Sequence, residues 1–231
     1  MKIGIIGTGQ IGTTLVQRLS AAGHQVKIAN SRGPASLAAL AADTGARAVP
    51  VTEAVVDVDV VVVSIPLLNI PQLPAGLLDR AAPSTIVIDT GNYYPRQRDG
   101  EIAAIEDGML ESRWTELHLK RPVIKAFNNI YATHLKSLNL PAGAPGRIAL
   151  PVAGDDAQAK AVVMRLIDII GFDVVDTGGM DESWRQQPGT PVYTGDFDSD
   201  GTRRALAQAQ PGRSAEWRAT AASPGTFEQP A

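Results

Sequence analysis

The stretch KIGIIGTGQIGTTL, residues 2–15, decides the fold of this chain. Its first part, Lys2 to Gly7, is a short β-branched run that predicts a strand. Ile11, Leu15 and Leu19 follow at helical spacing, so the strand leads directly into a helix. The turn that joins them reads Gly7-Thr8-Gly9-Gln10-Ile11-Gly12, which is the pattern G-x-G-x-x-G. A strand, a glycine-rich turn and a helix in this order predict the first unit of an alternating α/β fold.

Each glycine of this turn has its own physical reason. Gly7 allows the tight turn, Gly9 lets a pyrophosphate approach the backbone, and Gly12 lets the helix pack closely on the strand. The free N–H groups at the start of the helix can then bind the pyrophosphate. We therefore predict a dinucleotide site at residues 7–12, and a glycine-rich turn without a ligand is the alternative.

Strands and helices alternate along most of the chain. Further strands are predicted at His24–Asn30, 46–50, 57–66, 84–90, 121–127, Arg147–Gly154 and Phe172–Gly178. A helix with Pro at its start and Gly at its end is predicted at Pro34–Gly45, and an amphipathic helix separates the last two strands. The predicted fold class is therefore α/β, a doubly wound and mostly parallel sheet of the Rossmann type with a small C-terminal extension.

The composition of the chain changes after Gly178. Residues 1–178 form the predicted nucleotide-binding domain, which includes the last β-α-β unit. Residues 179–231 are polar and rich in turn residues, with a short helix predicted at Gly201–Gln210. Residues 219–231 have the composition of a flexible tail. We expect residues 179–231 to complete the active-site cleft or to form a dimer contact.

Charge balance and missing residue types exclude several functions. The chain has 21 Lys and Arg against 24 Asp and Glu, a net charge of −3, so nucleic acid and anionic membranes are not expected partners. It has no cysteine, which excludes disulfides, thiolate metal sites and a cysteine nucleophile. The apolar stretch Val60–Pro66 is far too short to span a membrane, and the N-terminus lacks the apolar core of a signal peptide. We expect a cytoplasmic protein that acts on a small molecule.

No metal site is predicted. The three histidines, at positions 24, 118 and 134, are not spaced as metal ligands. Residues 194–201, TGDFDSDG, resemble half of an EF-hand loop, but the twelfth loop position is Ala207, where calcium binding needs a Glu. We interpret Asp200 as the N-cap of the helix that follows.

The second predicted strand ends in Asn30, Ser31 and Arg32. A carboxylate at the end of this strand accepts hydrogen bonds from the ribose 2′-OH of NAD and repels a 2′-phosphate. Asn30 occupies that position here, and the hydroxyl of Ser31 and the guanidinium of Arg32 can both bind a phosphate. The cofactor is therefore predicted to be NADP(H). The alternative is that Arg32 contacts only solvent.

Three later loops follow the carboxyl ends of predicted strands. They are Ser64-Ile65-Pro66, residues 89–94 and residues 125–130. Because parallel strands end at the same edge of a sheet, these loops should line the nicotinamide end of the crevice. Local roles stay open for single residues, since Pro66 can start a helix, Asp89 can cap a turn, and Asn128 can close backbone hydrogen bonds.

Four stretches of this sequence carry a family resemblance. MKIGIIGTGQIGTTLVQRLSAAGHQVKIANSRGP, VVVSIP, IVIDTGN and VIKAFNNIYATHL, in this order, resemble the F420-dependent NADP reductases from Met1 to about Gly178. The resemblance implies a Rossmann-type domain, a homodimer, and direct hydride transfer between C4 of the nicotinamide and C5 of the deazaflavin coenzyme F420.

The resemblance also implies which residues form each half of the site. Thr8, Gly9, Gln10 and Ile11 would line the pyrophosphate, and Ser31 and Arg32 would bind the 2′-phosphate. Ser64, Ile65 and Pro66 would flank the nicotinamide ribose, and Ala126, Asn128 and Ile130 would border the deazaflavin pocket. Pro66, Asn128 and Ile130 would lie near the transferred hydride, and no acid or base is obligatory because the cofactors supply the chemistry.

Lys125 and His134 could handle protons, but we expect both to be structural. A strand-end lysine is usually solvated, and a lone helix histidine usually caps or packs.

Three functions remain open at this point. They are an NADP(H)-dependent oxidoreductase with F420 as partner, an NADPH-dependent reductase of a flavin, imine or carbonyl compound, and a non-enzymatic NADPH sensor. Hydroxyacid dehydrogenases and pyrroline-carboxylate reductases need a longer helical C-terminal domain than residues 179–231 provide.

Overall fold

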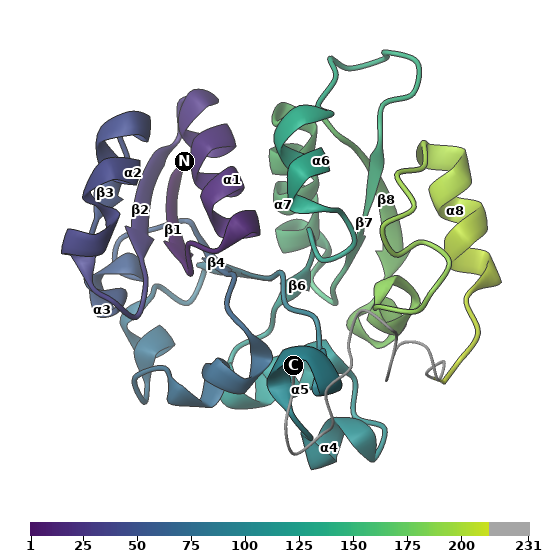
Figure 1. Ribbon diagram of the computed structural model, residues 1–231, viewed down its shortest axis with the longest axis horizontal. Coiled ribbons are helices and arrows are strands. Elements are labelled where there is room, and N and C mark those ends of the chain that lie inside the picture. The colour runs from purple at the N-terminus through teal and green to yellow at the C-terminus, as the bar shows by residue number, and fades with distance from the viewer. Residues whose placement is uncertain (213–231) are drawn as a thin grey trace.

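Eight strands form one sheet in the computed structural model, which describes residues 1–212 (Figure 1). The strands are β1 (Lys2–Ile6), β2 (Gln25–Ala29), β3 (Arg47–Ala48), β4 (Val60–Val63), β5 (Ile86–Asp89), β6 (Ile124–Lys125), β7 (Ala149–Ala153) and β8 (Asp173–Gly178). Their order in the sheet is β3-β2-β1-β4-β5-β6-β7-β8. Neighbouring strands are parallel, except that β6 and β7 are antiparallel. The predicted α/β class and the mostly parallel sheet are confirmed.

The eight observed strands coincide with the eight predicted ones, although several are shorter. The third and sixth strands each have only two residues in the ladder. The strand order turns back between β1 and β4, since β2 and β3 lie on one side of β1 and β4 to β8 on the other. A doubly wound sheet binds its ligand at such a switch point, outside the carboxyl ends of the strands.

Helices cover both faces of the sheet (Figure 1). The α-helices are α1 (Gln10–Ala21), α2 (Ala38–Thr44), α3 (Val51–Ala54), α4 (Ala103–Glu106), α5 (Glu111–Leu119), α6 (Ala132–Ser137), α7 (Ala157–Ile169) and α8 (Ser199–Gln208). Short 3₁₀ segments are η1 (Pro34–Leu37), η2 (Leu67–Gln72), η3 (Leu77–Arg80) and η5 (Met180–Gln186), and η4 (Pro95–Asp99) is one π-helical turn. The predicted helix Pro34–Gly45 is therefore observed with a 3₁₀ first turn, and Gly45 ends it in the left-handed conformation at φ 71°.

The core consists of two apolar layers separated by the sheet. Along β4, Val60 and Val62 face the layer that contains α1, α6 and α7, whereas Val61 and Val63 face the layer that contains α3, α5 and η2. All four valines are at most 2% exposed. A strand that is buried on both faces needs an unbroken apolar run, which explains the sequence VVVV.

The segment after β8 returns across the end of the sheet. Helix α8 packs on β7 and β8, where Ala205 and Leu206 meet Ala149, Val175 and Val192. Figure 1 shows α8 beside β8, at the opposite end of the sheet from β3.

The start of α8 corrects one prediction. The N-cap is Asp198, whose Oδ1 accepts a hydrogen bond from Gly201 N at 2.7 Å, and the helix begins at Ser199. The prediction that Asp200 is the N-cap is wrong, because Asp200 already lies within the helix and pairs with Arg203 at 2.9 Å. The flexible tail predicted at residues 219–231 lies outside the described residues.

Across residues 1–212, no helix has both the length and the apolar character needed to cross a membrane.

Candidate functional site

A cleft of about 840 Å³ opens at the carboxyl ends of β1, β4, β5 and β6. Its volume is typical of sites that enclose a small molecule or cofactor. The glycine-rich turn, the loops after β4, β5 and β6, and residues from the C-terminal segment form its walls. The lining residues are Gly9, Gln10, Ile11, Ser64, Ile65, Pro66, Thr90, Gly91, Asn92, Tyr94, Gln97, Arg98, Phe127, Asn128, Ile130, Tyr131, Ala132, Tyr193 and Thr194.

The glycine-rich turn has the geometry that its sequence predicts. Gly7 has φ 99°, and a Cβ atom there would lie 2.1 Å from the carbonyl oxygen of Ser64. A Cβ atom on Gly12 would lie 2.0 Å from the Gly7 carbonyl oxygen, so the helix can approach the strand only without a side chain. A Cβ atom on Gly9 would meet nothing within 4 Å. Space therefore remains above Gly9, on the cleft side of the turn.

Helix α1 begins in that space. Gly9 is its N-cap and offers no side-chain acceptor to the N–H groups of the first turn. Among the described residues, the first turn of α1 contains no Asp or Glu. Unpaired N–H groups and the positive end of the helix dipole favour an anion here.

The turn after β2 is organised by Asn30. Its Oδ1 accepts a hydrogen bond from the backbone N–H of Arg32 at 2.9 Å, and its Nδ2 donates to Ser36 Oγ at 3.0 Å. A further hydrogen bond, of 3.4 Å, joins Nδ2 to Thr8 Oγ1 in the glycine-rich turn. Ser36, which our sequence analysis did not select, therefore belongs to this cluster.

Ser31 and Arg32 are exposed at the tip of this turn. The side chain of Arg32 has no hydrogen bond or ion pair with any residue among 1–212. The turn thus presents a free guanidinium beside the glycine-rich turn.

The other predicted site residues are divided between the cleft surface and the layer beneath it. Ser64, Ile65, Pro66 and Ile130 line the cleft. Pro66 also precedes the first residue of η2, so the proposed helix-start role is observed as well. Ala126 is fully buried in the core, and its N–H donates to Asp89 O at 3.1 Å.

Asn128 lines the cleft, but its side-chain amide is fully bonded within the protein. Its Nδ2 donates to Gln186 O at 2.7 Å and to Asn92 Oδ1 at 3.1 Å, and its Oδ1 accepts from Gln186 Nε2 at 2.9 Å. The amide therefore ties η5 to the loops after β5 and β6, which fits the alternative that it closes internal hydrogen bonds.

Lys125 has a structural role, as expected, but it is buried and not solvated. Its side chain is 0% exposed, and its Nζ donates to Asp89 Oδ2 at 3.0 Å and to the carbonyl oxygen of Gly91. Asp89 is 1% exposed and accepts two further hydrogen bonds, from Gly91 N at 2.8 Å and from Ser112 Oγ at 3.0 Å. This buried ion pair supports the cleft floor from below, because Thr90 and Gly91 are part of the lining.

His134 packs as predicted, away from the cleft lining. Its ring meets the edge of Tyr131 at 5.3 Å and contacts the carboxylate of Asp196.

Two tyrosines meet in the cleft, one from the loop of residues 89–94 that the sequence predicted to line it and one, Tyr193, that the sequence analysis missed. The hydroxyls of Tyr94, from the loop after β5, and Tyr193, from the C-terminal segment, are hydrogen-bonded to each other. Burial raises the pKa of Tyr94 and that of Tyr193 above the usual value. The guanidinium of Arg98 lies over the Tyr94 ring, 5.0 Å from its centroid. No local pattern distinguishes Tyr193, which stands in the turn-rich sequence after Gly178.

The C-terminal segment is fastened to the cleft by its backbone. Thr194 N donates to Asn129 O at 2.7 Å, and Thr194 has a positive φ of 58°. Phe127, which also lines the cleft, has a positive φ of 63°. Non-glycine residues with a positive φ are uncommon, and they occur preferentially at functional sites.

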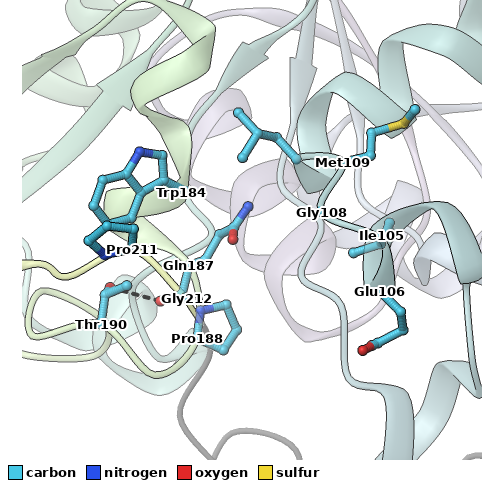
Figure 2. Close-up of a pocket in the computed structure, with 11 residues that line it drawn as sticks. Ile105, Glu106, Gly108, Met109, Trp184, Gln187, Pro188, Thr190, Pro211 and Gly212 are labelled. Carbon is cyan, nitrogen blue, oxygen red and sulfur yellow. Dashed lines mark hydrogen bonds between the residues drawn. The ribbon is translucent and has the colours of Figure 1, made fainter.

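A second pocket, of about 340 Å³, lies between the segment that follows α4 and the segment that follows η5. Figure 2 shows Trp184, Pro188 and Pro211 on one side of it and Ile105 and Met109 on the other. This second pocket is not lined by the glycine-rich turn or by the residues directly after β1, β4 and β6. The larger cleft therefore has the better claim to be the functional site.

No group of three or more His, Cys, Asp or Glu side chains within residues 1–212 is arranged to hold a metal ion.

Comparisons with known proteins agree with this fold. The sequence profile of the family described as NADP oxidoreductase, coenzyme F420-dependent, matches residues 2–93. A hypothetical protein of Sinorhizobium meliloti, known from its crystal structure, is 30% identical with a TM-score of 0.70, over 84% of this chain and 93% of that chain. A candidate F420-dependent NADP reductase of Arthrobacter sp. FB24 is 21% identical with a TM-score of 0.60, over 79% and 87% of the two chains.

The Escherichia coli protein YjhV is 47% identical over 73 residues, which are 32% of this chain. The matched part is 53% of YjhV, so the chain spans about half of that relative's length.

The fold and the cleft place the chain in the class of Rossmann-type α/β proteins. Within this class, the chain belongs to the family of coenzyme F420-dependent NADP oxidoreductases.

Proposed function

We propose that this protein transfers a hydride between NADP(H) and the deazaflavin coenzyme F420. The observation that carries the cofactor half is Arg32, an exposed guanidinium without a partner among the described residues, on a turn that Asn30 holds against the glycine-rich turn. A 2′-phosphate is a charged group that can pair with such a guanidinium, whereas a 2′-OH gains little from it.

The nucleotide half has room and donors for the rest of the cofactor. The pyrophosphate would lie over Gly9, where the turn leaves open space, against the N–H groups of the first turn of α1. Ser64, Ile65 and Pro66 would then hold the nicotinamide ribose at the carboxyl end of β4. NADP(H) supplies the hydride, and the chain binds and orients it.

The acceptor half faces the same cleft. Ile65, Pro66 and Ile130 form an apolar surface against which a flat ring system can stack, and Tyr94 and Tyr193 add hydroxyls. Stacking fixes the distance between the donor and acceptor carbons, and exclusion of water protects the hydride. The family to which this chain belongs supports F420 as the acceptor.

An absorbance assay tests the acceptor. The protein is mixed with NADPH and oxidised F420, and we expect the visible band of the oxidised deazaflavin to disappear. A flavin, an imine and a ketone serve as alternative acceptors in parallel, with NADPH absorbance as the readout. Turnover with one of these and none with F420 would replace the acceptor. Tight NADPH binding without any turnover would favour the sensor.

The variant Arg32→Ala tests the cofactor. A hydrogen bond to a charged group contributes about 1.5–3 kcal/mol, so the Kd for NADPH should rise about 10- to 150-fold. The Kd for NADH should change less than twofold. Arg47→Ala, which removes an exposed arginine of β3, is the matched control. Equal losses for NADPH and NADH in Arg32→Ala would contradict the proposal that Arg32 binds the 2′-phosphate.

A further inference from the structure

We propose that Tyr193 is a catalytic hydrogen-bond donor to the hydride acceptor. Its phenol lies at the end of a one-way chain of hydrogen bonds and keeps its own proton for a ligand in the cleft. The acceptor it fits carries a carbonyl oxygen or ring nitrogen that gains negative charge when the hydride arrives. This inference rests on the proposed function, because it concerns the acceptor half of the same cleft.

The series of hydrogen bonds begins at the side-chain amide of Asn128, whose orientation is fixed by a backbone carbonyl group. A carbonyl oxygen can only accept, so the contact of 2.7 Å with Gln186 O identifies the Asn128 atom there as Nδ2, the donor. The same reasoning fixes Gln186, whose Nε2 donates to Pro151 O at 3.2 Å and to Asn128 Oδ1 at 2.9 Å. Both side chains of this part of the network are buried.

The next amide, that of Asn92, is fixed in the same way. Its Nδ2 donates to the backbone carbonyl of Asn128 at 2.7 Å, so its Oδ1 is the atom that accepts from Asn128 Nδ2 at 3.1 Å. One Nδ2 hydrogen of Asn92 remains. It is donated to the hydroxyl of Tyr94 at 3.3 Å.

The contact between the two hydroxyls allows either of them to be the donor. We assign the proton of Tyr94 to this hydrogen bond, because Tyr94 already accepts from Asn92 and a hydroxyl that accepts one bond and donates the next continues the series in one direction. Tyr193 is then an acceptor in this pair, and no other residue among 1–212 takes its proton. Its side chain lines the cleft together with Ile65, Pro66 and Ile130. A hydroxyl that already accepts one hydrogen bond is a stronger donor.

The surroundings keep both phenols protonated. Burial raises the pKa of Tyr193 well above its usual value, so at neutral pH the group is a donor. The guanidinium of Arg98 reinforces the chain, since it donates to Asn92 O at 2.6 Å and lies over the Tyr94 ring.

The atoms of the reaction balance with this role. A C–H bond at C4 of the dihydronicotinamide breaks, and a C–H bond forms at the electrophilic carbon of the acceptor. The electron pair of the acceptor's double bond moves to its oxygen or nitrogen, which water then protonates. Tyr193 donates to that atom while its charge develops. Donors aimed at a developing charge in an enclosed site are among the largest single contributions to catalysis.

The variant Tyr193→Phe tests the role, and Ser137→Ala is the control. Ser137→Ala also removes one hydroxyl, but the Oγ of Ser137 donates to the backbone carbonyl of Thr133 and Ser137 is not among the residues that line the cleft. In single-turnover experiments with NADPH and F420, we expect hydride transfer to slow about 10- to 100-fold in Tyr193→Phe and less than twofold in Ser137→Ala. The Kd for NADPH should stay within twofold in both.

A binding measurement gives a readout without turnover. The Kd of oxidised F420 for the complex of the protein with NADP⁺, followed by deazaflavin fluorescence, should rise about fivefold or more in Tyr193→Phe. Tyr94→Phe keeps the Tyr193 hydroxyl but removes its donor, so its effect on both readouts should be smaller than that of Tyr193→Phe. It also serves as the second variant if Tyr193→Phe does not fold.

The outcomes separate this inference from the proposed function. If the wild-type protein transfers no hydride to F420 or to any other acceptor, the proposed function fails and the role of Tyr193 with it. If the wild-type protein is active and Tyr193→Phe equals it in rate and in affinity for the acceptor, the role of Tyr193 alone is refuted.

Discussion

Lys125→Met should be one of the most destabilising single changes in this protein. The substitution keeps an apolar stem of similar length but removes the charge that faces Asp89, whose side chain is 1% exposed. Asp89 would retain Gly91 N and Ser112 Oγ as donors, and the carbonyl of Gly91 would lose one. Breaking a buried ion pair by removing one partner costs about 3–5 kcal/mol, and the two remaining donors favour the lower part of that range. We expect a loss of about 3–4 kcal/mol.

Lys160→Met is the matched control. Lys160 is also buried, at 8% exposure, and its Nζ pairs with Asp176 at 2.7 Å. The Asp176 side chain is 50% exposed, so water can solvate it when the lysine is removed. The control should therefore lose only about 1 kcal/mol.

Urea unfolding measures both variants. With a slope of about 2–3 kcal/mol/M, the midpoint of Lys125→Met should fall by about 1–2 M, and that of the control by less than 0.5 M. The double variant Asp89→Asn/Lys125→Met should regain part of the loss, because no uncompensated charge remains buried. A loss below 1 kcal/mol in Lys125→Met, or one equal to that of the control, would refute the reasoning.

Three further changes have definite expected results. Gly12→Ala should lower the free energy of unfolding in urea by about 2–3 kcal/mol and abolish NADPH binding, because its Cβ would lie 2.0 Å from a carbonyl oxygen. Gly9→Ala, whose Cβ would meet nothing within 4 Å, should leave stability unchanged. Asp198→Ala removes the N-cap of α8 and should lower the thermal midpoint by an amount equivalent to about 1 kcal/mol, measured by circular dichroism. Burial raises the pKa of Tyr94 and that of Tyr193, so the unfolded chain loses these protons first, near pH 10, and the free energy of unfolding should fall as pH rises beyond 10. Replacing both with Phe should flatten that fall in urea unfolding at pH 9 and pH 11, and an unchanged slope would contradict the assigned direction of the shifts.

The sequence was sufficient for the parts of the fold that depend on local patterns. The glycine-rich turn could be predicted because each glycine answers a constraint within a few residues or on the adjacent strand, as Gly7 and Gly12 show. The buried strands could be predicted because both faces must be apolar, as in Val60–Val63.

Contacts between distant segments could not be predicted in this way. Lys125 looks solvated because it is charged and ends a strand, and its burial depends on Asp89, which lies 36 positions earlier. The hydroxyls of Tyr94 and Tyr193 meet across 99 positions. Neither pairing leaves a spacing pattern, since each partner fits its own local sequence equally well without the other.

The antiparallel direction of β7 and the N-cap of α8 could not be predicted for other reasons. A strand that follows a helix is expected to be parallel, but direction depends on where the connection crosses the sheet, which strand composition does not encode. At the start of α8, Asp198 and Asp200 are both good caps by residue type, and the choice depends on which backbone turn closes on Gly201.

The two walls of the cleft come from separate stretches of chain, with a practical consequence for engineering. The nucleotide wall lies within residues 2–93, the part that the family profile covers, whereas Ile130, Tyr193 and Thr194 belong to later sequence. On the proposed function, substitutions at Ile130 and Tyr193 should change the acceptor preference and leave the coenzyme preference unchanged. A chimera that joins residues 1–93 of this protein to the remainder of a relative should keep the coenzyme of this protein. Its acceptor preference should combine both parents, because Ile65 and Pro66 come from one and the later wall from the other.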